Sequence, residues 1–301
     1  MRVFVTGATG FVGSAVVQEL ISAGHQVLGL ARSEENARSL IAAGAEAHRG
    51  DLEDLESLRS GAAASDGVIH TGFVHDFTRF KEVCEIDRRA IAALGEELAG
   101  SDRPLIITSG IGMLNTPGRL ATEEDIPSAS SPNPRVASEL EADAVGALGV
   151  RVSVVRLPPS VHGENDHGFV PILIGMAREK GVSAYKEEGA NRWPAVHRLD
   201  AAKLYRLALE KASDGVVRYH AVADEGVAFR TIAESIGQGL GIPVVSKSPE
   251  QAAEHFSWFS HFAAMDCAAS GRQTREKLGW HPVQFGLIED LEKGDYFKIK
   301  E

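Results

Sequence analysis

The chain has 301 residues, a formal net charge of −11 at pH 7 and a hydrophobic fraction of 44%. This apolar fraction is ordinary for a globular protein with a large core, and the acidic balance argues against nucleic acid as the main partner. Two cysteines, Cys84 and Cys267, are too few for a disulfide framework, and no apolar run approaches the length of a membrane span, so we expect a cytoplasmic protein without membrane contact.

The first thirteen residues carry the clearest motif. Residues 2–5 are β-branched and aromatic, as in a strand, residues 6–13 read TGATGFVG, and the apolar spacing from residue 14 to 23 is helical. Strand, glycine turn and helix in this order are typical of a dinucleotide-binding site, in which backbone amides at the start of the helix hold a pyrophosphate. The sequence therefore predicts cofactor binding by Gly7, Thr9, Gly10, Phe11, Val12 and Gly13.

The end of the second predicted strand, residues 25–31, indicates which dinucleotide is bound. An acidic residue at this place accepts the ribose hydroxyls of NAD, whereas an arginine accommodates the 2′-phosphate of NADP. Here the chain reads Ala31, Arg32 and Ser33, with no carboxylate before Glu34. We therefore predict that Arg32 and Ser33 bind NADP; the alternative is a solvated arginine in a loop.

Short apolar strands then alternate with helices, which predicts a parallel sheet with crossover helices. The sequence thus favours an α/β fold, a Rossmann-type doubly wound parallel sheet over residues 1–160, with a smaller C-terminal substrate lobe over residues 161–301 that returns to the sheet in part. Predicted helices span 36–43, 54–63, 80–99, 133–148, 169–179, 200–211 (capped by Asp200) and 231–240; predicted strands span 45–49, 67–70, 105–107, 151–157 and 216–222, and residues 160–168 are expected to be a loop.

Several polar residues lie at the predicted carboxyl ends of these strands. Besides the glycine turn and Arg32, they are Asp51, Thr71 and Thr108. Ligands of open α/β sheets bind at this edge, so the agreement among several strands strengthens the prediction from the glycine turn.

The chain resembles the short-chain dehydrogenase/reductase superfamily in its extended, epimerase/dehydratase-like form. The matching stretches are 6–13, Gly50-Asp51-Leu52, 68–70, 107–109, 155–158, 161–163 and 196–200. The resemblance implies that Asp51 meets the adenine amino group with Leu52 beside the base, that Thr71 and Gly72 line the cofactor, and that Leu157 and Pro158 approach the nicotinamide. It also implies a homodimer through helices 80–99 and 134–148. The alternatives are that Asp51 caps a helix and that the prolines only end a strand.

The catalytic residues of that superfamily are replaced. The resemblance implies a serine or threonine, and a Tyr-x-x-x-Lys pair on the helix after the fifth strand, but Arg135 stands where the tyrosine is expected and Glu139 where the lysine is. Gly110 takes the usual serine position, with Ser109 one residue earlier. Arginine keeps its proton at any working pH, so it cannot act as the acid. Arg135 and Glu139 either form a surface ion pair with each other, or Arg135 anchors an anionic or oxygen-rich substrate.

A replacement proton donor is expected near the loops after the fifth and sixth strands. Ser109, His162 and His167 are the candidates we favour, with Ser160 and Tyr185 as further possibilities, because histidine titrates near neutral pH. A metal bound by His162, Glu164, Asp166 and His167 is conceivable, but the intervening Gly163 and Asn165 suit a turn better, and no metal is expected. Tyr296 and Lys300 have the spacing of the missing pair, yet they lie in what we expect to be a frayed tail.

Three functions follow as hypotheses. The first is an NADP(H)-dependent reductase of a carbonyl or conjugated small molecule, with Phe169, Trp193, Phe256, Trp258 and Phe259 closing an apolar pocket over the nicotinamide. The second is an NADP(H)-binding sensor or scaffold that has lost catalysis. The third is an isomerase or dehydratase that holds its cofactor tightly.

Overall fold

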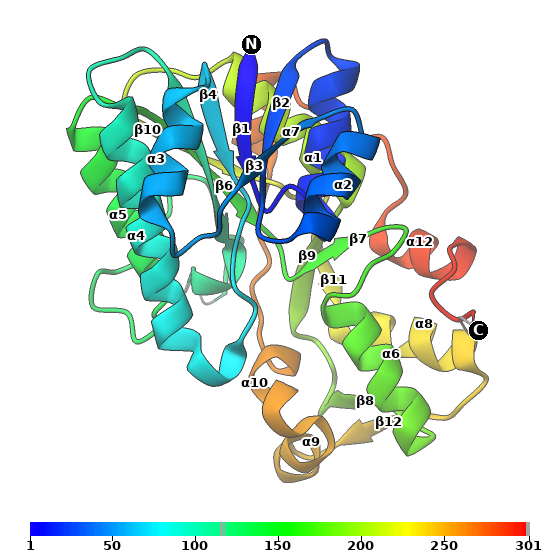
Figure 1. Cartoon of the computed structure of the whole chain (residues 1–301). Helices are drawn as coiled ribbons and strands as arrows, with labels where there is room; N and C mark the ends of the chain where they lie inside the picture. The colour runs from blue at the N-terminus through cyan, green and yellow to red at the C-terminus, as the bar shows by residue number, and fades with distance from the viewer. Residues whose placement is uncertain (115, 117, 299–301) are drawn as a thin grey trace.

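The computed structural model describes residues 1–114, 116 and 118–298 (Figure 1). Its strands are β1 (Arg2–Thr6), β2 (Gln26–Ala31), β3 (Glu46–Arg49), β4 (Gly67–His70), β5 (Pro104–Gly110), β6 (Arg151–Leu157), β7 (Ser160–His162), β8 (Ser183–Lys186), β9 (Arg192–His197), β10 (Val216–His220), β11 (Asp224–Ala228) and β12 (Val244–Lys247). Its α-helices are α1 (Phe11–Ser22), α2 (Glu34–Ala42), α3 (Leu55–Ala63), α4 (Phe80–Leu98), α5 (Val136–Ala147), α6 (Phe169–Lys180), α7 (Arg198–Glu210), α8 (Phe229–Leu240), α9 (Pro249–Phe256), α10 (Ser260–Ala263), α11 (Arg272–Leu278) and α12 (Leu287–Lys293).

The large sheet is parallel and doubly wound, as the sequence predicts. Its seven strands follow the order β10-β6-β5-β4-β1-β2-β3, and every neighbouring pair is parallel. The order reverses between β1 and β4, so the chain winds outward from β1 in both directions. In such a sheet ligands bind beyond the carboxyl ends of the strands near this reversal.

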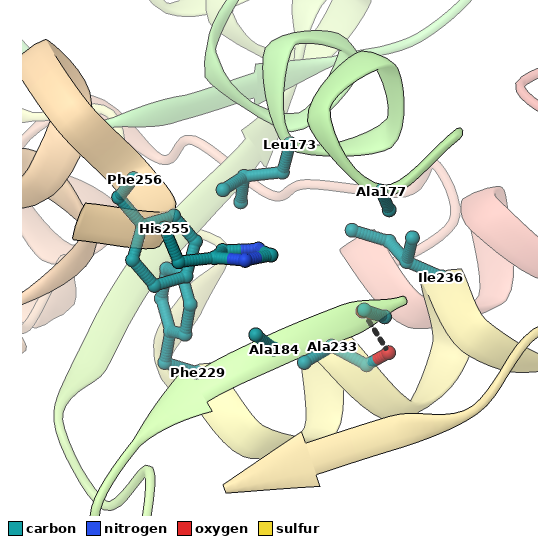
Figure 2. Close-up of a pocket in the computed structure, with 9 residues that line it drawn as sticks. Leu173, Ala177, Ala184, Phe229, Ala233, Ile236, His255 and Phe256 are labelled. Atoms are coloured by element: carbon teal, nitrogen blue, oxygen red, sulfur yellow. Dashed lines mark hydrogen bonds between the residues drawn. The ribbon is translucent and has the colours of Figure 1, made fainter. Parts of the chain in front are cut away.

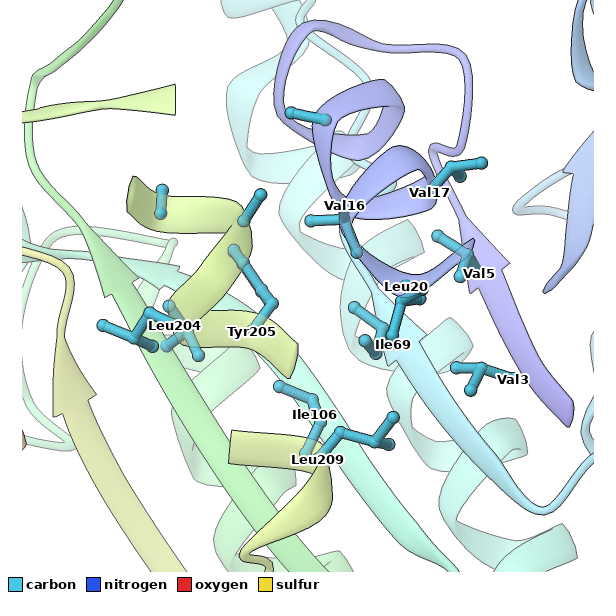
Figure 3. Packing of buried hydrophobic residues seen from close by; sticks show 14 of the residues in the cluster. Val3, Val5, Val16, Val17, Leu20, Ile69, Ile106, Leu204, Tyr205 and Leu209 are labelled. Carbon is cyan, nitrogen blue, oxygen red and sulfur yellow. The ribbon is translucent and has the colours of Figure 1, made fainter. Parts of the chain in front are cut away.

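Alternate residues of each strand face opposite helical layers, because successive side chains in a strand point to opposite faces. Val3 and Val5 of β1 pack with residues of α1, α2 and α7 in one core (Figure 3). Phe4 points the other way, into a second core with α3, α4 and α5. The N-terminal strand is therefore buried on both faces, which fixes the glycine turn that follows it.

The chain leaves this sheet after β6 and returns to it. Helix α7 covers the face next to α1, and β10 adds an edge strand beside β6. Trp280, which follows α11, is buried against the same face and donates through Nε1 to the carbonyl oxygen of Asp200 at 2.9 Å. Residues beyond 161 thus contribute to both parts of the molecule.

The second lobe contains short strands that the sequence did not predict. Strands β7, β9 and β11 form one small sheet, and β8 pairs with β12 (Figure 1). The predicted loop over 160–168 is wrong at its beginning, because β7 pairs there in parallel with β9. The predicted cap of α7 is also wrong: the His197 side chain accepts from the amide of Leu199, whereas Asp200 accepts from the amides of Val283 and Gln284.

The expected aromatic pocket is a packed core. Phe169, Trp193, Phe256 and Phe259 pack together inside the second lobe, whereas the Trp258 side chain is 55% exposed. A cavity of only about 10 Å³ remains in this core, with the His255 ring among Leu173, Phe229 and Ile236 (Figure 2). This space holds no more than one water molecule.

Among the described helices, none has both the length and the apolar character that a bilayer crossing requires.

Candidate functional site

The glycine turn has the close packing that a dinucleotide site requires. Gly7 has φ +65°, and a Cβ added there would lie 2.7 Å from the backbone of Gly72. A Cβ on Gly13 would lie 2.0 Å from the carbonyl oxygen of Gly7, so α1 can approach the turn only with glycine at this position. Thr9 and Gly10 are exposed between these two contacts. The predicted turn therefore exists, with its open part toward solvent.

The start of α1 can receive an anion. Gly10 precedes the helix in an extended conformation, and no side chain in the described part of the chain caps the first turn. The amide of Ser14 donates to the carbonyl oxygen of Gly10, while the amides of Phe11, Val12 and Gly13 precede the first intrahelical bond. Uncapped amides at the positive end of the helix dipole fit a diphosphate.

The end of β2 lies beside this turn. Ser33 caps α2, since its Oγ accepts from the amide of Asn36 at 3.1 Å, and the Asn36 side chain donates to Thr9 Oγ1 at 3.0 Å. Ser33 is therefore occupied as a helix cap in the free protein. Arg32 is exposed and forms no hydrogen bond or ion pair with any part of the chain that the structure describes. Its guanidinium is available to a ligand.

The predicted adenine contacts lie on the loop after β3. Asp51 is exposed and its Oδ1 accepts from the amides of Glu53 and Asp54. Asp54, not Asp51, caps α3, by accepting from the amide of Ser57 at 3.1 Å. The alternative of a helix-capping Asp51 is therefore wrong. Leu52 packs on Gly72, where a Cβ would lie 2.9 Å from Leu52 Cδ2.

The ends of β4, β5 and β6 complete this edge of the sheet. Thr71 Oγ1 donates to the carbonyl oxygen of Thr6 at 2.7 Å, and Thr108 Oγ1 donates to the carbonyl oxygen of His70 at 2.8 Å. Leu157 ends β6 half-buried and is followed by a buried Pro158. The predicted cofactor residues thus lie at the ends of neighbouring strands, as parallel pairing requires.

Arg135 belongs to a buried polar cluster. Its Nη1 pairs with Asp87 Oδ2 at 2.5 Å, and its Nη2 donates to the carbonyl oxygen of Thr108 at 2.8 Å. Ser138 joins both Arg135 and Asp87. Burial alone would raise the pKa of Asp87, but the Arg135 charge and the hydrogen bond from His70 outweigh it and hold that pKa well below its usual range. Arg135 is therefore a fixed cation.

This cluster reaches the glycine turn through His70. Its Nε2 lies 3.0 Å from Asp87 Oδ1 and its Nδ1 lies 2.6 Å from Thr6 Oγ1. Thr6 Oγ1 also accepts from the amide of Gly72 at 3.1 Å. Because an ionised carboxylate only accepts hydrogen bonds, Nε2 is the donor in the contact with Asp87. A continuous buried chain of polar contacts joins β1 to Arg135.

Glu139 belongs to a different cluster. Its Oε1 accepts from Arg156 Nε at 2.7 Å and its Oε2 accepts from Arg218 Nε at 2.9 Å. Burial alone would raise the pKa of Glu139, but the hydrogen bonds and charge of Arg156, together with Arg218, lower it. The expected surface pair between Arg135 and Glu139 is therefore wrong, because both side chains point inward to separate partners.

The proposed proton donors differ in accessibility. Ser109 is buried and its hydroxyl donates to Glu139 Oε1 at 2.8 Å. His162 is 0% exposed and its Nδ1 lies 2.7 Å from Asp290 Oδ2. Neither side chain is exposed to a ligand in this structure, and their roles as proton donors stay predictions. Ser160 is likewise buried, in β7, and Tyr185 lies in the second lobe beneath Arg230.

His167 is exposed, and its ring centroid lies 5.5 Å from that of Phe11 at the start of α1. The loop after β7 thus reaches the glycine turn. In the described part of the chain, no three His, Cys, Asp or Glu side chains are grouped to hold a metal ion.

The tail is not frayed where the structure describes it. Tyr296 is half-buried and its hydroxyl accepts from the amide of Gly163 at 2.9 Å. Lys300, the other member of the Tyr-x-x-x-Lys spacing, lies outside the described residues. Tyr296 is therefore part of the loop structure after β7.

Two residues near the site were missed by the sequence reasoning. His75 follows β4, and burial, Arg135 and His167 together lower its pKa, in that order of importance. The Phe73 ring contacts both Arg135 and His75. The Phe73 ring centroid lies 4.3 Å from Arg135 Cζ and 5.4 Å from the His75 ring centroid. Arg198 Cζ lies 5.2 Å from the Phe11 ring centroid. The placement of His75 five residues after a predicted strand was a usable signal, whereas Arg198 carried none.

This geometry defines an α/β protein with a doubly wound parallel sheet, a glycine turn of the dinucleotide-binding type after β1, and Arg135 and Glu139 where the resemblance implies a tyrosine and a lysine. A model described as the NAD dependent epimerase/dehydratase family matches residues 3–94. The chain belongs to this family, within the extended branch of the short-chain dehydrogenase/reductase superfamily.

Relatives resemble the chain over almost its full length. An uncharacterized protein of Schizosaccharomyces pombe is 51% identical over 298 residues, which cover 99% of this chain and 100% of the relative. A UDP-glucose 4-epimerase of Streptomyces lividans is 27% identical and covers 95% of this chain and 93% of its own. The solved structure of DesIV, a dTDP-glucose 4,6-dehydratase from Streptomyces venezuelae with NAD and TYD bound, has a TM-score of 0.80 at 19% identity and covers 99% and 96% of the two chains.

Proposed function

We propose that the protein is an NADP(H)-dependent oxidoreductase that reduces a carbonyl or conjugated small molecule without the usual tyrosine and lysine. One observation carries the cofactor assignment: an exposed Arg32, without a partner among the described residues, lies beside uncapped helix amides. Arginine binds phosphate through planar, charge-assisted hydrogen bonds. The buried free thiols of Cys84 and Cys267 are compatible with a reducing cytoplasm.

The residues would divide the work as follows. Amides of Phe11 and Val12 hold the diphosphate, and Arg32 binds the 2′-phosphate. Asp51 and Leu52 contact the adenine, while Leu157 and Pro158 border the nicotinamide. The cofactor supplies the hydride.

Arg135 takes the place of the tyrosine but would assist the reaction in a different way. It stays protonated, so it cannot deliver a proton, but a fixed guanidinium stabilises negative charge that develops on a substrate oxygen. Asp87 and the carbonyl oxygen of Thr108 hold it in place before the substrate arrives. His167 is the proton donor in this proposal, because it is exposed and borders the cofactor turn.

The test begins with binding. NADPH and NADH are titrated by fluorescence against the wild type, Arg32→Ala and the control Arg272→Ala, an exposed arginine in α11. Loss of a charge-assisted contact should weaken NADPH binding to Arg32→Ala by about tenfold to a hundredfold and leave NADH unchanged. Equal affinity of the wild type for both cofactors would remove the argument for NADP.

Turnover is then measured as loss of NADPH absorbance with a panel of aldehydes, ketones and enones. Oxidation of NADPH by one class of substrate, with a lower rate in His167→Ala, would support the reductase and identify the donor.

A second function is favoured by one specific observation: Arg135, Glu139 and Ser109 are all engaged in buried contacts. A protein that binds NADPH but oxidises it with no member of the panel would be the binding protein that this observation favours.

A further inference from the structure

The last described residues of the chain are bound to the loop after β7. Tyr296 Oη accepts from the amide of Gly163 at 2.9 Å and donates to Asp166 Oδ2 at 3.0 Å. Asp166 Oδ1 accepts from the amide of Gly168 at 2.7 Å. Burial and the Asp166 charge raise the pKa of Tyr296, so its hydroxyl keeps the proton that it donates. One tyrosine thus links the start of the 163–168 loop to its end.

Residues 287–298, which we call the C-terminal strap, are themselves anchored. At the beginning of the strap, Asp290 of α12 pairs with the buried His162 at 2.7 Å. At its end, the carbonyl oxygen of Phe297 accepts from Arg178 Nη2 at 2.9 Å. The Phe297 ring lies so close to α8 that a Cβ on Gly239 would be 2.2 Å from it. Tyr296 is therefore presented to the loop from a fixed base.

The loop depends on such support. Asn165 has φ +64° and Gly163 has φ +133°. Residues other than glycine rarely adopt such positive φ values. A non-glycine residue in this region persists when its surroundings hold it there. The Tyr296 and Asp166 contacts flank Asn165 on both sides, so they supply this restraint.

The far end of the same loop borders the cofactor turn. The His167 ring packs edge-on against Phe11, and the Arg198 guanidinium lies over the same phenyl ring. Phe11 is the first residue of α1, where the uncapped amides begin. A ligand bound to these amides lies next to the 163–168 loop, and its release is easier when the loop can move away.

We infer that Tyr296 is a positioning residue for the cofactor: together with Asp166 it holds the 163–168 loop against Phe11 and thereby slows cofactor dissociation. The inference rests on the proposed function, because it requires a dinucleotide at the start of α1. Tyr296 itself touches no cofactor atom in this account and acts through the loop.

The experiment measures NADPH dissociation by stopped-flow fluorescence, with excess NADP⁺ as the displacing ligand. Tyr296→Phe removes the hydroxyl with its hydrogen bonds, and Asp166→Asn removes the charge and one of the two carboxylate oxygens that accept hydrogen bonds. Glu164→Gln is the matched control within the loop, because the Glu164 side chain is exposed and forms no hydrogen bond or ion pair with the described residues. Asp295→Asn is the control within the strap, where the Asp295 side chain pairs, among the described residues, with the exposed Lys298.

Loss of the hydrogen bond between Tyr296 and Asp166, which both variants disrupt, should raise koff by about threefold to tenfold in Tyr296→Phe and in Asp166→Asn. The association rate and both controls should stay at wild-type values, and the double variant should be no faster than the faster single variant, because the two residues share one contact. A change confined to kon, equal koff in all variants, or the same effect in Glu164→Gln would overturn the inference. Wild-type protein that binds neither dinucleotide would instead overturn the proposed function, and the inference with it.

Discussion

Two regions at the carboxyl ends of the same parallel sheet, the glycine turn (the open edge) and the start of α5 (the closed edge), use their polar groups in opposite ways. At the glycine turn the groups are open: the first-turn amides of α1 are uncapped and Arg32 has no partner among the described residues. At the start of α5 the groups are closed: the half-buried Arg135 is paired with Asp87, and the buried Glu139 is paired with Arg156. The comparison shows that a family motif can be retained at the glycine turn while the residues of the neighbouring motif form internal ion pairs.

Removing Glu139 should have the largest effect on stability. Glu139→Ala leaves the buried Arg156 and the half-buried Arg218 without their shared carboxylate, and breaking one side of a buried ion pair costs about 3–5 kcal/mol. Denaturant unfolding measures the change. Glu141→Ala on the same helix is the control, because its pair with Arg88 is partly exposed and should contribute less than about 1 kcal/mol. A similar loss of unfolding free energy in both variants would contradict the claim that the ion pairs of Glu139 are buried and contribute more than an exposed pair.

Gly13→Ala should nearly abolish cofactor binding. The new Cβ would lie 2.0 Å from the Gly7 carbonyl oxygen, so the turn must move away from α1. Loss of charge-assisted phosphate contacts predicts at least roughly a hundredfold weaker NADPH binding. Gly175→Ala in α6 is the control, since its Cβ meets nothing within 4 Å. Wild-type affinity in Gly13→Ala would show that the open edge is not the binding edge.

Arg135→Lys should separate binding from turnover. Lysine keeps the positive charge beside Asp87 but lacks the planar fork that also reaches the carbonyl oxygen of Thr108. We expect kcat to fall by about tenfold to a hundredfold, while the NADPH dissociation constant changes less than about twofold. Unchanged kcat would mean that Arg135 has only a structural role, namely its ion pair with Asp87.

Acid should weaken the closed edge through His220, which lies 3.2 Å from Arg156 and is also influenced by Glu123 and Glu139. Burial, the largest cause, lowers the pKa of His220 from 6.5 to about 4. Below about pH 6.5 the unfolded chain therefore takes up a proton that the folded protein refuses, and stability falls as the pH falls. This contributes on the order of 1–2 kcal/mol between pH 7 and pH 5.

Urea unfolding at pH 7, 6 and 5 tests this effect. His220→Gln should reduce the pH dependence, while the exposed His281→Gln should leave it unchanged. The idea fails if His220→Gln retains the full wild-type slope.

The sequence predicted the sheet well because its signals are local. Strands at 67–70 and 151–157 have the expected bounds, and the glycine turn follows β1 as predicted. The small strands of the second lobe were missed because they are short and pair over long distances. For example, β9 contains Pro194 and takes its partners from β7 and β11.

The candidate site was predictable only in part, for a related reason. Arg135 and Glu139 could be located from the family pattern, but their partners lie far along the chain, at Asp87, Arg156 and Arg218. A spacing of four on one helix suggested that they pair with each other. Glu139 instead pairs with distant arginines, because its face of α5 is buried toward the sheet. Local spacing does not reveal the burial of a single polar residue, because that burial depends on tertiary packing.

The most direct test of the account is calorimetric titration of the purified, folded protein with NADPH and NADH. The open glycine turn and Arg32 predict a single site per chain that binds NADPH at least about tenfold more tightly than NADH, since each charge-assisted phosphate contact contributes about 1.5 kcal/mol or more. Absence of heat with both dinucleotides at concentrations up to about 1 mM, the weak end of specific binding, would contradict it.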